Sequence, residues 1–376
     1  MSTDRNTRAW MEIRADALAA NLARIRASVG PGVRIVPMVK ADAYGLGVER
    51  AVEVLERSDP WGFGVATVEE GVALRATGVD RPILVSSPTP PASVEAGVAS
   101  GLILSVSSLP SLALLEEAAE RSSGEASFHL EVDTGMGRAG FDWRAVAEWA
   151  PRARRAHEKG IRWAGCFTHL HSADEGVDTV ALQWERFQEA LAAARPPAGA
   201  LVHALNSAGA LRCPEYAADA VRPGIFLYGG RAGRDLPEPE PVASVRARVV
   251  HVRRAPVGTT VGYGATYRAE KDERWASVAI GYGDGLPRAL GNRGSALVRG
   301  RRVPIIGRIS MDVTVVDISD VASVEPGDVV TFLGADGDGR ITVEEVAEGV
   351  GTISYEILIG FTSRIPRIWM DHDLGS

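Results

Sequence analysis

In the first part of the chain, short apolar runs alternate with longer stretches in which apolar residues recur at intervals of three or four. Short apolar runs between turn residues predict buried strands, and the longer periodic stretches predict helices with one buried face. The predicted strands cover residues 33–39, 62–66, 82–86, 102–106, 128–133, 161–168, 201–204 and 219–221. The predicted helices cover residues 17–26, with Asp16 as the N-cap, and then 48–56, 68–76, 109–119, 143–156 and 181–194. Eight strand–helix units within roughly 200 residues are typical of a TIM (β/α)8 barrel.

A doubly wound open sheet is the alternative for this alternation of strands and helices. That fold carries a glycine-rich dinucleotide turn after its first strand. The sequence after residue 39 lacks that motif, so we expect the barrel.

The pattern changes after Gly230. Residues 235–241 are acidic and rich in proline, which is typical of a linker. Beyond them, short β-branched runs at 245–252, 277–280, 296–298, 303–306, 313–318 and 329–333 predict strands, interrupted by a helix at 343–347 and the segment 353–359. We therefore predict a barrel domain over 13–235 and a second, smaller C-terminal all-β domain over 236–376, with residues 1–12 attached to it.

Composition and charge narrow the classes of partner. The net charge is −7 and the isoelectric point about 5.6, so the chain has no basic surface typical of nucleic-acid binding. No apolar run approaches the ~18 residues of a membrane span. The two cysteines, Cys166 and Cys213, form neither a metal-binding spacing nor a disulfide framework. We expect a cytoplasmic protein with no metal, no nucleic acid and no membrane partner.

One lysine stands out at the end of the first predicted strand. The chain has three lysines (Lys40, Lys159 and Lys271) against 38 arginines, and Lys40 follows the apolar run 33–39. A partly desolvated lysine can lose its proton and form an imine, whereas arginine does neither. Lys40 therefore indicates chemistry that needs an amine. The other interpretation is a strand-end lysine whose ammonium reaches solvent.

Further polar residues follow the other predicted strands. In a TIM barrel, the loops after the carboxyl ends of the strands build the active site. The residues that these loops bring to one face are Lys40, Tyr44, Asp133, Arg138, Thr168, His169, Asn206, Ser207, Arg222 and Gly224.

Together these residues match the needs of pyridoxal phosphate. The ends of strands seven and eight commonly hold a phosphate, and Ser207, Gly224 and Ile225 suit that task. The cofactor also needs a lysine and a partner for its ring nitrogen, for which Arg222 is well placed. Taken alone, His169 is a satisfied strand-end histidine and Arg222 a structural ion pair, so the prediction rests on their joint position.

The motifs around these residues resemble those of the alanine racemase family, which binds pyridoxal phosphate. Lys40 stands in Val39-Lys40-Ala41-Asp42-Ala43-Tyr44-Gly45, and the resemblance continues through Asp133-Thr134-Gly135-Met136-Gly137-Arg138, Thr168-His169, His203-Ala204-Leu205-Asn206-Ser207 and Arg222-Pro223-Gly224. In the second domain it covers Gly262-Tyr263-Gly264, Gly281-Tyr282-Gly283-Asp284-Gly285, Gly307-Arg308-Ile309-Ser310-Met311-Asp312 and Ile353-Ser354-Tyr355-Glu356. The resemblance therefore spans nearly the whole chain in order.

The resemblance implies a homodimer in which each active site joins one barrel to the partner's β domain. Lys40 would hold the cofactor covalently and act as one catalytic base, and Tyr263 of the partner subunit would act as the other. A cationic pair of His169 and Arg222 would lower the pKa of that tyrosine. The remaining cofactor contacts implied are Tyr44, Arg138, Asn206, Ser207, Gly224, Ile225 and Tyr355. Arg138, Met311, Tyr263 and Tyr282 would bind the substrate, and Asp174, Arg288 and Arg308 match residues that line its access channel.

One position departs from the family pattern. The family often has a carbamylated lysine two residues before Asp133, and this chain has Glu131. Alternation along the strand puts Glu131 on the face of Asp133, so we expect it to supply the negative charge for Arg138. Because glutamate is several atoms shorter than the carbamylated lysine, either Arg138 is placed differently or a water or ion bridges the gap. Leu205, His171 and Ser310 also differ, which bears on substrate size.

The leading function is racemisation of L-alanine and D-alanine for D-alanine supply to peptidoglycan. The alternatives are a racemase of serine or another small amino acid, a barrel-type amino-acid decarboxylase, and a non-enzymatic pyridoxal phosphate-binding protein. The predicted β domain with Tyr263 argues against the last, because such proteins resemble the barrel alone.

Overall fold

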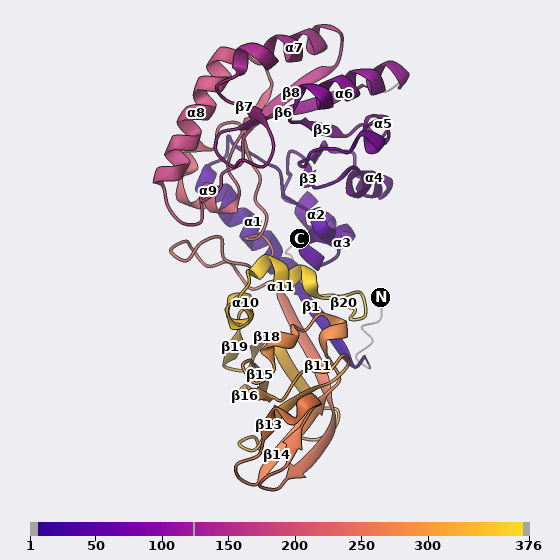
Figure 1. Cartoon of the computed structure of the whole chain (residues 1–376), viewed down its shortest axis with the longest axis vertical. Helices are drawn as coiled ribbons and strands as arrows, with labels where there is room; N and C mark the ends of the chain where they lie inside the picture. The colour runs from indigo at the N-terminus through magenta and orange to yellow at the C-terminus, as the bar shows by residue number, and fades with distance from the viewer. Residues whose placement is uncertain (1–6, 123–124, 371–376) are drawn as a thin grey trace.

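The computed structural model describes residues 7–122 and 125–370. Figure 1 shows an elongated molecule with a helix-rich barrel at one end and a strand-rich part at the other. The two parts correspond to the change of pattern after Gly230.

Within the described residues, eight parallel strands form the barrel. They are β2 (Arg34–Ile35), β3 (Phe63–Val65), β4 (Ile83–Val85), β5 (Ile103–Val106), β6 (Ser127–Asp133), β8 (Arg162–Phe167), β9 (Leu201–His203) and β10 (Ala220–Val221), in the order β2-β10-β9-β8-β6-β5-β4-β3. A parallel bridge between Met38 and Gly64 joins the chain after β2 to β3 and closes the ring. The predicted barrel is confirmed. The two-residue strand β7 (Phe141–Asp142) pairs beside β6.

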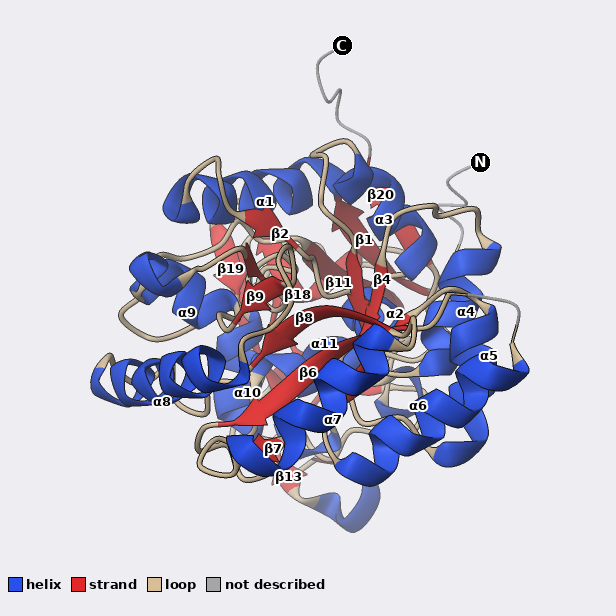
Figure 2. Cartoon of the chain, turned by 90° about the horizontal axis from the view of Figure 1, so that it is seen from above, coloured by secondary structure: helices blue, strands red, loops and turns tan. Residues whose placement is uncertain are grey.

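Helices surround the strands, as seen from above in Figure 2. They are α1 (Ala15–Val29), α2 (Lys40–Gly45), α3 (Val48–Glu56), α4 (Val68–Ala76), α5 (Val94–Ala99), α6 (Leu109–Arg121), α7 (Val146–Glu158), α8 (Asp178–Ala194) and α9 (Ser207–Arg212), with short 3₁₀ turns η1 (Pro91–Ser93) and η2 (Pro214–Tyr216).

One local prediction in the barrel is wrong. Asp16 is not the N-cap of the first helix, because α1 begins at Ala15 and Arg14 occupies the cap; Asp16 instead pairs with the Arg14 side chain at 2.7 Å. The strand predicted over 33–39 is broadly confirmed: β2 itself covers Arg34–Ile35, and beyond it the Val36 and Met38 amides donate to the carbonyl oxygens of Val221 and Pro223 at 2.9 Å each. The six-residue helices α5 and α9 were too short to show a helical period.

Within the described residues, the second part consists of a nine-stranded mixed sheet and a separate two-stranded sheet, β12–β13, with few helices. Its strands are β1 (Ala9–Arg14), β11 (Ala243–Ala255), β12 (Thr260–Val261), β13 (Tyr267–Arg268), β14 (Glu273–Val278), β15 (Ser295–Val298), β16 (Arg301–Ile306), β17 (Thr314–Asp317), β18 (Val329–Asp336), β19 (Gly339–Ile341) and β20 (Arg367–Met370). Its helical elements are η3 (Tyr263–Ala265), η4 (Tyr282–Asp284), η5 (Arg288–Leu290), α10 (Val343–Val350) and α11 (Ser354–Gly360). The N-terminal strand β1 lies in the nine-stranded sheet, antiparallel to β11 and parallel to β20.

The strand predicted over 277–280 is misplaced, because β14 begins at Glu273 and ends at Val278. Its first residues are charged and polar in sequence, but Glu273 is buried and accepts hydrogen bonds from Tyr267 and Trp275. A buried carboxylate whose hydrogen bonds are satisfied looks like an exposed residue in the sequence, so the pattern did not predict the first half of the strand.

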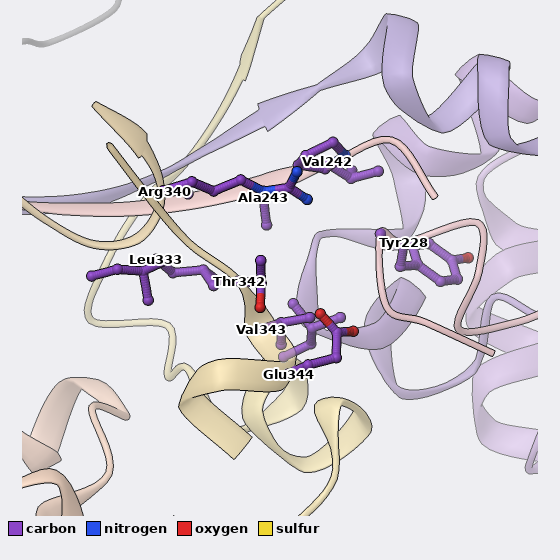
Figure 3. Close-up of a pocket in the computed structure, with 13 residues that line it drawn as sticks. Tyr228, Val242, Ala243, Leu333, Arg340, Thr342, Val343 and Glu344 are labelled. Carbon is purple, nitrogen blue, oxygen red and sulfur yellow. The ribbon is translucent and has the colours of Figure 1, made fainter. Parts of the chain in front are cut away.

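The junction between the two parts fixes one wall of the barrel mouth. The Tyr44 and Tyr228 rings stack with centroids 4.5 Å apart, and the Tyr228 hydroxyl donates to the Met38 carbonyl oxygen at 2.8 Å. Figure 3 shows Tyr228 on the barrel side of a small cavity, with Val343 and Glu344 of α10 across from it. This cavity measures about 20 Å³, room for about one water molecule. The junction is thus closely packed, and Tyr44 has little freedom to move.

Candidate active site

Lys40 begins an unusual turn. The four residues after it, Ala41 to Tyr44, all have left-handed backbone angles, with φ between 51° and 56°. Left-handed conformations cost L-residues about 1–2 kcal/mol each. The turn is held by hydrogen bonds: Glu70 accepts from the Ala41 amide at 2.7 Å, and Asp42 accepts from the Val48 amide at 2.8 Å. A strained backbone that is this well supported indicates a functional constraint.

The turn opens onto a cavity of about 310 Å³ at the carboxyl ends of the barrel strands. All ten residues predicted to bind the cofactor line this cavity: Lys40, Tyr44, Arg138, His169, Asn206, Ser207, Arg222, Gly224, Ile225 and Tyr355. The sequence reasoning did not include six further lining residues, which are Met38, Ser86, Ser87, Pro88, Ala139 and Phe167. Their positions in the sequence could have indicated them. Three of them follow β4, Phe167 is the last residue of β8, and Met38 and Ala139 stand close to Lys40 and Arg138.

One side of the cavity suits a phosphate group. The Gly224 amide donates to the Ser207 hydroxyl oxygen at 2.8 Å, so the hydroxyl proton of Ser207 remains available to another acceptor. The Tyr44 hydroxyl lies so close to Gly224 that a Cβ there would be 2.1 Å from it. Because Gly224 has no side chain, the Tyr44 hydroxyl can lie close to the Gly224 backbone and the Ser207 hydroxyl. We call this group of polar atoms the phosphate cradle, since a phosphate binds to such a set of hydroxyls and backbone amides.

Arg222 lies on the cavity wall with its guanidinium tightly held. It donates to the carbonyl oxygens of Thr168 at 2.9 Å and Ala204 at 3.2 Å, and also to Nδ1 of His203. Burial lowers the pKa of Arg222 to about 10, which still leaves it protonated at neutral pH.

The bond from Arg222 fixes the protonation of two buried histidines. Because Nδ1 of His203 accepts, its proton must be on Nε2, which lies 2.8 Å from Nδ1 of His129. Burial, followed by the charge of Arg222, lowers the pKa of both histidines, to about 3 for His129. A series of hydrogen bonds therefore leads from Arg222 through His203 to His129 in the barrel core, and both imidazoles in it are neutral. Alternation along β6 placed His129 on this face, but its partner could not be predicted.

The charges at the barrel mouth shift two more groups. Burial and then the charge of Arg138 lower the pKa of Lys40, with Arg222 acting in the same direction and Glu70 opposing it. Burial and the neighbouring cations lower the pKa of His169 to about 3. This shift favours the neutral form of His169, so in this structure the positive charge of the expected pair lies on Arg222.

Glu131 is buried beside the cavity, at 3% exposure. Its Oε2 accepts a hydrogen bond from the Ser107 hydroxyl at 2.7 Å. Burial raises the pKa of Glu131, while the Ser107 bond and the charges of Arg138 and Arg222 oppose that shift. Across the described residues, no ion pair within 4 Å joins Glu131 to Arg138. The absence of a direct pair agrees with the shorter reach of glutamate, and Oε2 of the carboxylate bonds Ser107 instead.

Of the site residues predicted on the β domain, Tyr355 lines this cavity and the others lie elsewhere. Tyr263, Tyr282 and Met311 are 70%, 40% and 52% exposed, and they do not line the barrel cavity of their own chain. The strand β13, which follows Tyr263, belongs to the two-stranded sheet β12–β13 and lies at the end of the molecule away from the barrel (Figure 1). The loops of Tyr282 and Met311 are neighbours, since the Gly283 amide donates to the Met311 carbonyl oxygen at 2.8 Å. Asp174, Arg288 and Arg308 are exposed as well.

Comparisons with known proteins agree along the whole chain. The family model described as "Alanine racemase, N-terminal domain" matches residues 13–232, and that described as "Alanine racemase, C-terminal domain" matches residues 242–369. The chain is 39% identical to the alanine racemase of Desulfosudis oleivorans over 96% of each chain. It is 38% identical to alanine racemase 2 of Bacillus subtilis, over 96% of this chain and 94% of that one. The solved alanine racemase of Streptomyces coelicolor A3(2) superposes with a TM-score of 0.91 at 33% identity, over 99% of this chain and 100% of that one.

The barrel, the β domain and the lysine-bearing cavity, with these full-length matches, define an isomerase of the amino-acid racemase class. The chain belongs to the alanine racemase family, and its reaction interconverts L-alanine and D-alanine.

Proposed function

We propose that this racemase depends on pyridoxal phosphate, held at the barrel mouth, and uses two bases on opposite faces of the substrate Cα. The observation that carries the proposal is the meeting of three chemistries on one cavity wall: the Lys40 amine, the cradle at Gly224 and the Arg222 guanidinium. When bound, the cofactor delocalises the electron pair left at Cα after deprotonation. The lowered pKa of Lys40 favours the neutral amine that covalent attachment needs.

The residues predicted to bind the cofactor have the following roles in this proposal. Lys40 holds the cofactor, and Tyr44, Ser207, Gly224, Ile225 and Tyr355 hold its phosphate, with Asn206 supporting that loop through its hydrogen bond from the Gly209 amide at 2.9 Å. Arg222 faces the ring nitrogen. Because Arg222 keeps its proton at neutral pH, that nitrogen is held unprotonated, which weakens the electron withdrawal and limits side reactions. His169 lies beside this wall as a neutral group.

The second base comes from another copy of the chain. Racemisation requires one group to remove the Cα proton and another to return it from the opposite face. Lys40 moves the proton at its Nζ, and Tyr263 of the partner subunit moves it at its Oη. The exposure of Tyr263, together with its absence from its own chain's cavity, supports a homodimer with shared sites. Exposed Ile353, Tyr355 and Ile359 near the barrel mouth add apolar surface that a partner would cover.

The substrate carboxylate is bound by Arg138 and by the Met311 backbone, and Tyr282 closes the remaining space. Among the described residues, no protein group bonds the Arg138 guanidinium, so it is available to an anion. Three tyrosines around one site leave room for a methyl side chain, which favours alanine over serine or larger amino acids.

Two features bear on where in the cell the enzyme acts. Within the described part of the chain, no helix has both the length and the apolar character needed to cross a bilayer. Both cysteines are free and buried, which fits a reducing compartment. We propose a cytoplasmic enzyme that supplies D-alanine as a peptidoglycan precursor.

One assay tests cofactor dependence and mechanism together. Purified enzyme is incubated with L-alanine in heavy water, and optical rotation, deuterium at Cα and carbon dioxide are followed. We expect racemisation with deuterium incorporation and no carbon dioxide. Lys40→Ala should remove both the visible cofactor absorption and the activity. A variant that keeps both would refute the role of Lys40, and release of carbon dioxide would favour the decarboxylase.

A further inference from the structure

The side chain of Glu70 connects two loops at the barrel mouth. It lies in the first turn of α4, after Thr67, and forms a capping box with it. Its Oε1 accepts from the Ala41 amide at 2.7 Å. Its Oε2 accepts from the Ala66 amide at 2.7 Å and from the Thr67 amide at 3.3 Å. One carboxylate thus joins the loop after β2 to the loop after β3.

Ala41 is the first residue of the left-handed turn and follows Lys40 directly. Because consecutive left-handed residues are unfavourable, the turn depends on outside contacts to persist. A hydrogen bond to a carboxylate is stronger than a neutral one. The bond from Ala41 to Glu70 therefore holds the turn at the point where it leaves Lys40.

Glu70 also adds a negative charge near the Lys40 amine. Burial, Arg138 and Arg222 all disfavour the ammonium form of Lys40, and Glu70 favours it. Without Glu70, the charges of Arg138 and Arg222, which lower the pKa of Lys40, would act on it unopposed by this carboxylate.

We propose that Glu70 is a positioning residue of the racemase site, which clamps the Lys40 turn to the β3–α4 loop. The proposal rests on the proposed function, in which Lys40 holds the cofactor. The sequence carried a signal for it, because Thr67-Val68-Glu69-Glu70 has the spacing of a capping box. That signal, however, predicts a helix start and not a contact with Ala41.

The preceding residue, Glu69, offers a matched control. It lies in the same first turn of α4, but it is exposed and accepts from the Ser93 hydroxyl at 2.8 Å, away from Ala41. Glu69→Gln and Glu70→Gln remove the same charge from the same helix end. They differ in whether the clamp is affected, because glutamine has one acceptor oxygen and cannot accept from both loops.

Hydrogen–deuterium exchange of the peptide that contains residues 40–47, measured by mass spectrometry on the full-length protein, tests the clamp. Loss of a charged hydrogen bond should speed exchange at Ala41 by about 10- to 100-fold in Glu70→Gln. Glu69→Gln should leave it unchanged. Thermal unfolding of both variants checks that the fold is retained. Equal exchange in the two variants would overturn the clamp.

A second measurement tests the charge. Pyridoxal phosphate is added to cofactor-free protein across a pH series, trapped on Lys40 with borohydride and counted by mass spectrometry. In Glu70→Gln the midpoint should move to lower pH, since the ammonium form loses its nearby carboxylate. Glu70→Asp keeps the charge but is too short to reach both loops, so it should speed exchange and retain the wild-type midpoint. A midpoint that does not move in Glu70→Gln would overturn the charge role. If wild type fails to bind the cofactor at all, the proposed function fails, and the exchange result still decides the clamp.

Discussion

Replacing Gly224 with alanine tests the phosphate cradle with a single methyl group. The backbone at Gly224 is not in the left-handed region, so alanine is tolerated conformationally and the effect is steric. The new Cβ would lie 2.1 Å from the Tyr44 hydroxyl oxygen and 2.9 Å from Cζ of the same ring. Ordinary contacts need about 3.5 Å, so the hydroxyl must move by more than about 1 Å.

Tyr44 cannot move freely in response. It is 5% exposed and stacked on Tyr228, whose own hydroxyl is bonded to Met38. Overpacking of this kind costs about 1–3 kcal/mol of stability. Losing a hydrogen bond to a charged phosphate costs about 1.5–3 kcal/mol, so the dissociation constant of pyridoxal phosphate should rise roughly 10- to 100-fold.

The assay is cofactor titration followed by absorption, combined with thermal unfolding. Gly32→Ala is the matched control, because a Cβ there meets nothing within 4 Å. Tyr44→Phe keeps the ring and removes the hydroxyl, so on that background Gly224→Ala should weaken the cofactor much less. If Gly224→Ala lowers stability but leaves the cofactor affinity unchanged, the hydroxyl does not contact the phosphate and the cradle is refuted.

Two other predictions address the subunit arrangement and the departure from the family pattern. A hybrid dimer of one Lys40→Ala chain and one Tyr263→Phe chain, purified through two tags, should recover about half of the wild-type activity, since one of its two shared sites is intact; a hybrid as inactive as either parent would mean that each chain completes its own site. Glu131→Gln should lower kcat/KM roughly tenfold or more by removing a negative charge that acts on Arg138, and unchanged kinetics would remove this role of Glu131. Because burial raises the pKa of Glu131, its ionised form costs stability above the unfolded pKa of about 4.3, so the variant should be at least as stable as wild type at pH 7 and lose that advantage near pH 4. The Ser107 bond survives in Glu131→Gln, since the amide oxygen can accept it, and thermal unfolding between pH 4 and pH 8 checks the sign.

The sequence by itself determined the architecture and ten of the residues that line the cavity. Parallel strands in a barrel end at one face, so knowing where each strand ends was enough to gather Lys40, Arg138, Ser207 and Arg222 on one wall. Boundaries were less certain where a satisfied polar group is buried in a strand, as at Glu273.

The tertiary structure alone decided how those residues are held. Nothing in Ala41-Asp42-Ala43-Tyr44 predicts a left-handed turn, because no glycine is present and the conformation depends on Glu70 from another loop. Glu131 bonds Ser107 and not Arg138. The sequence could not predict this partner, because the distance between Glu131 and Ser107 depends on how the neighbouring strands β5 and β6 are staggered.

The protonation of the histidines shows the same division. The sequence places His169 and His203 at strand ends, but it does not predict their protonation. Burial and nearby cations lower the pKa of both, and Arg222 sets the tautomer of His203. The hydrophobic period of a chain records which face of each element is buried. Hydrogen bonds and electric fields between distant segments depend on distances of a few ångströms, and the folded chain alone fixes those.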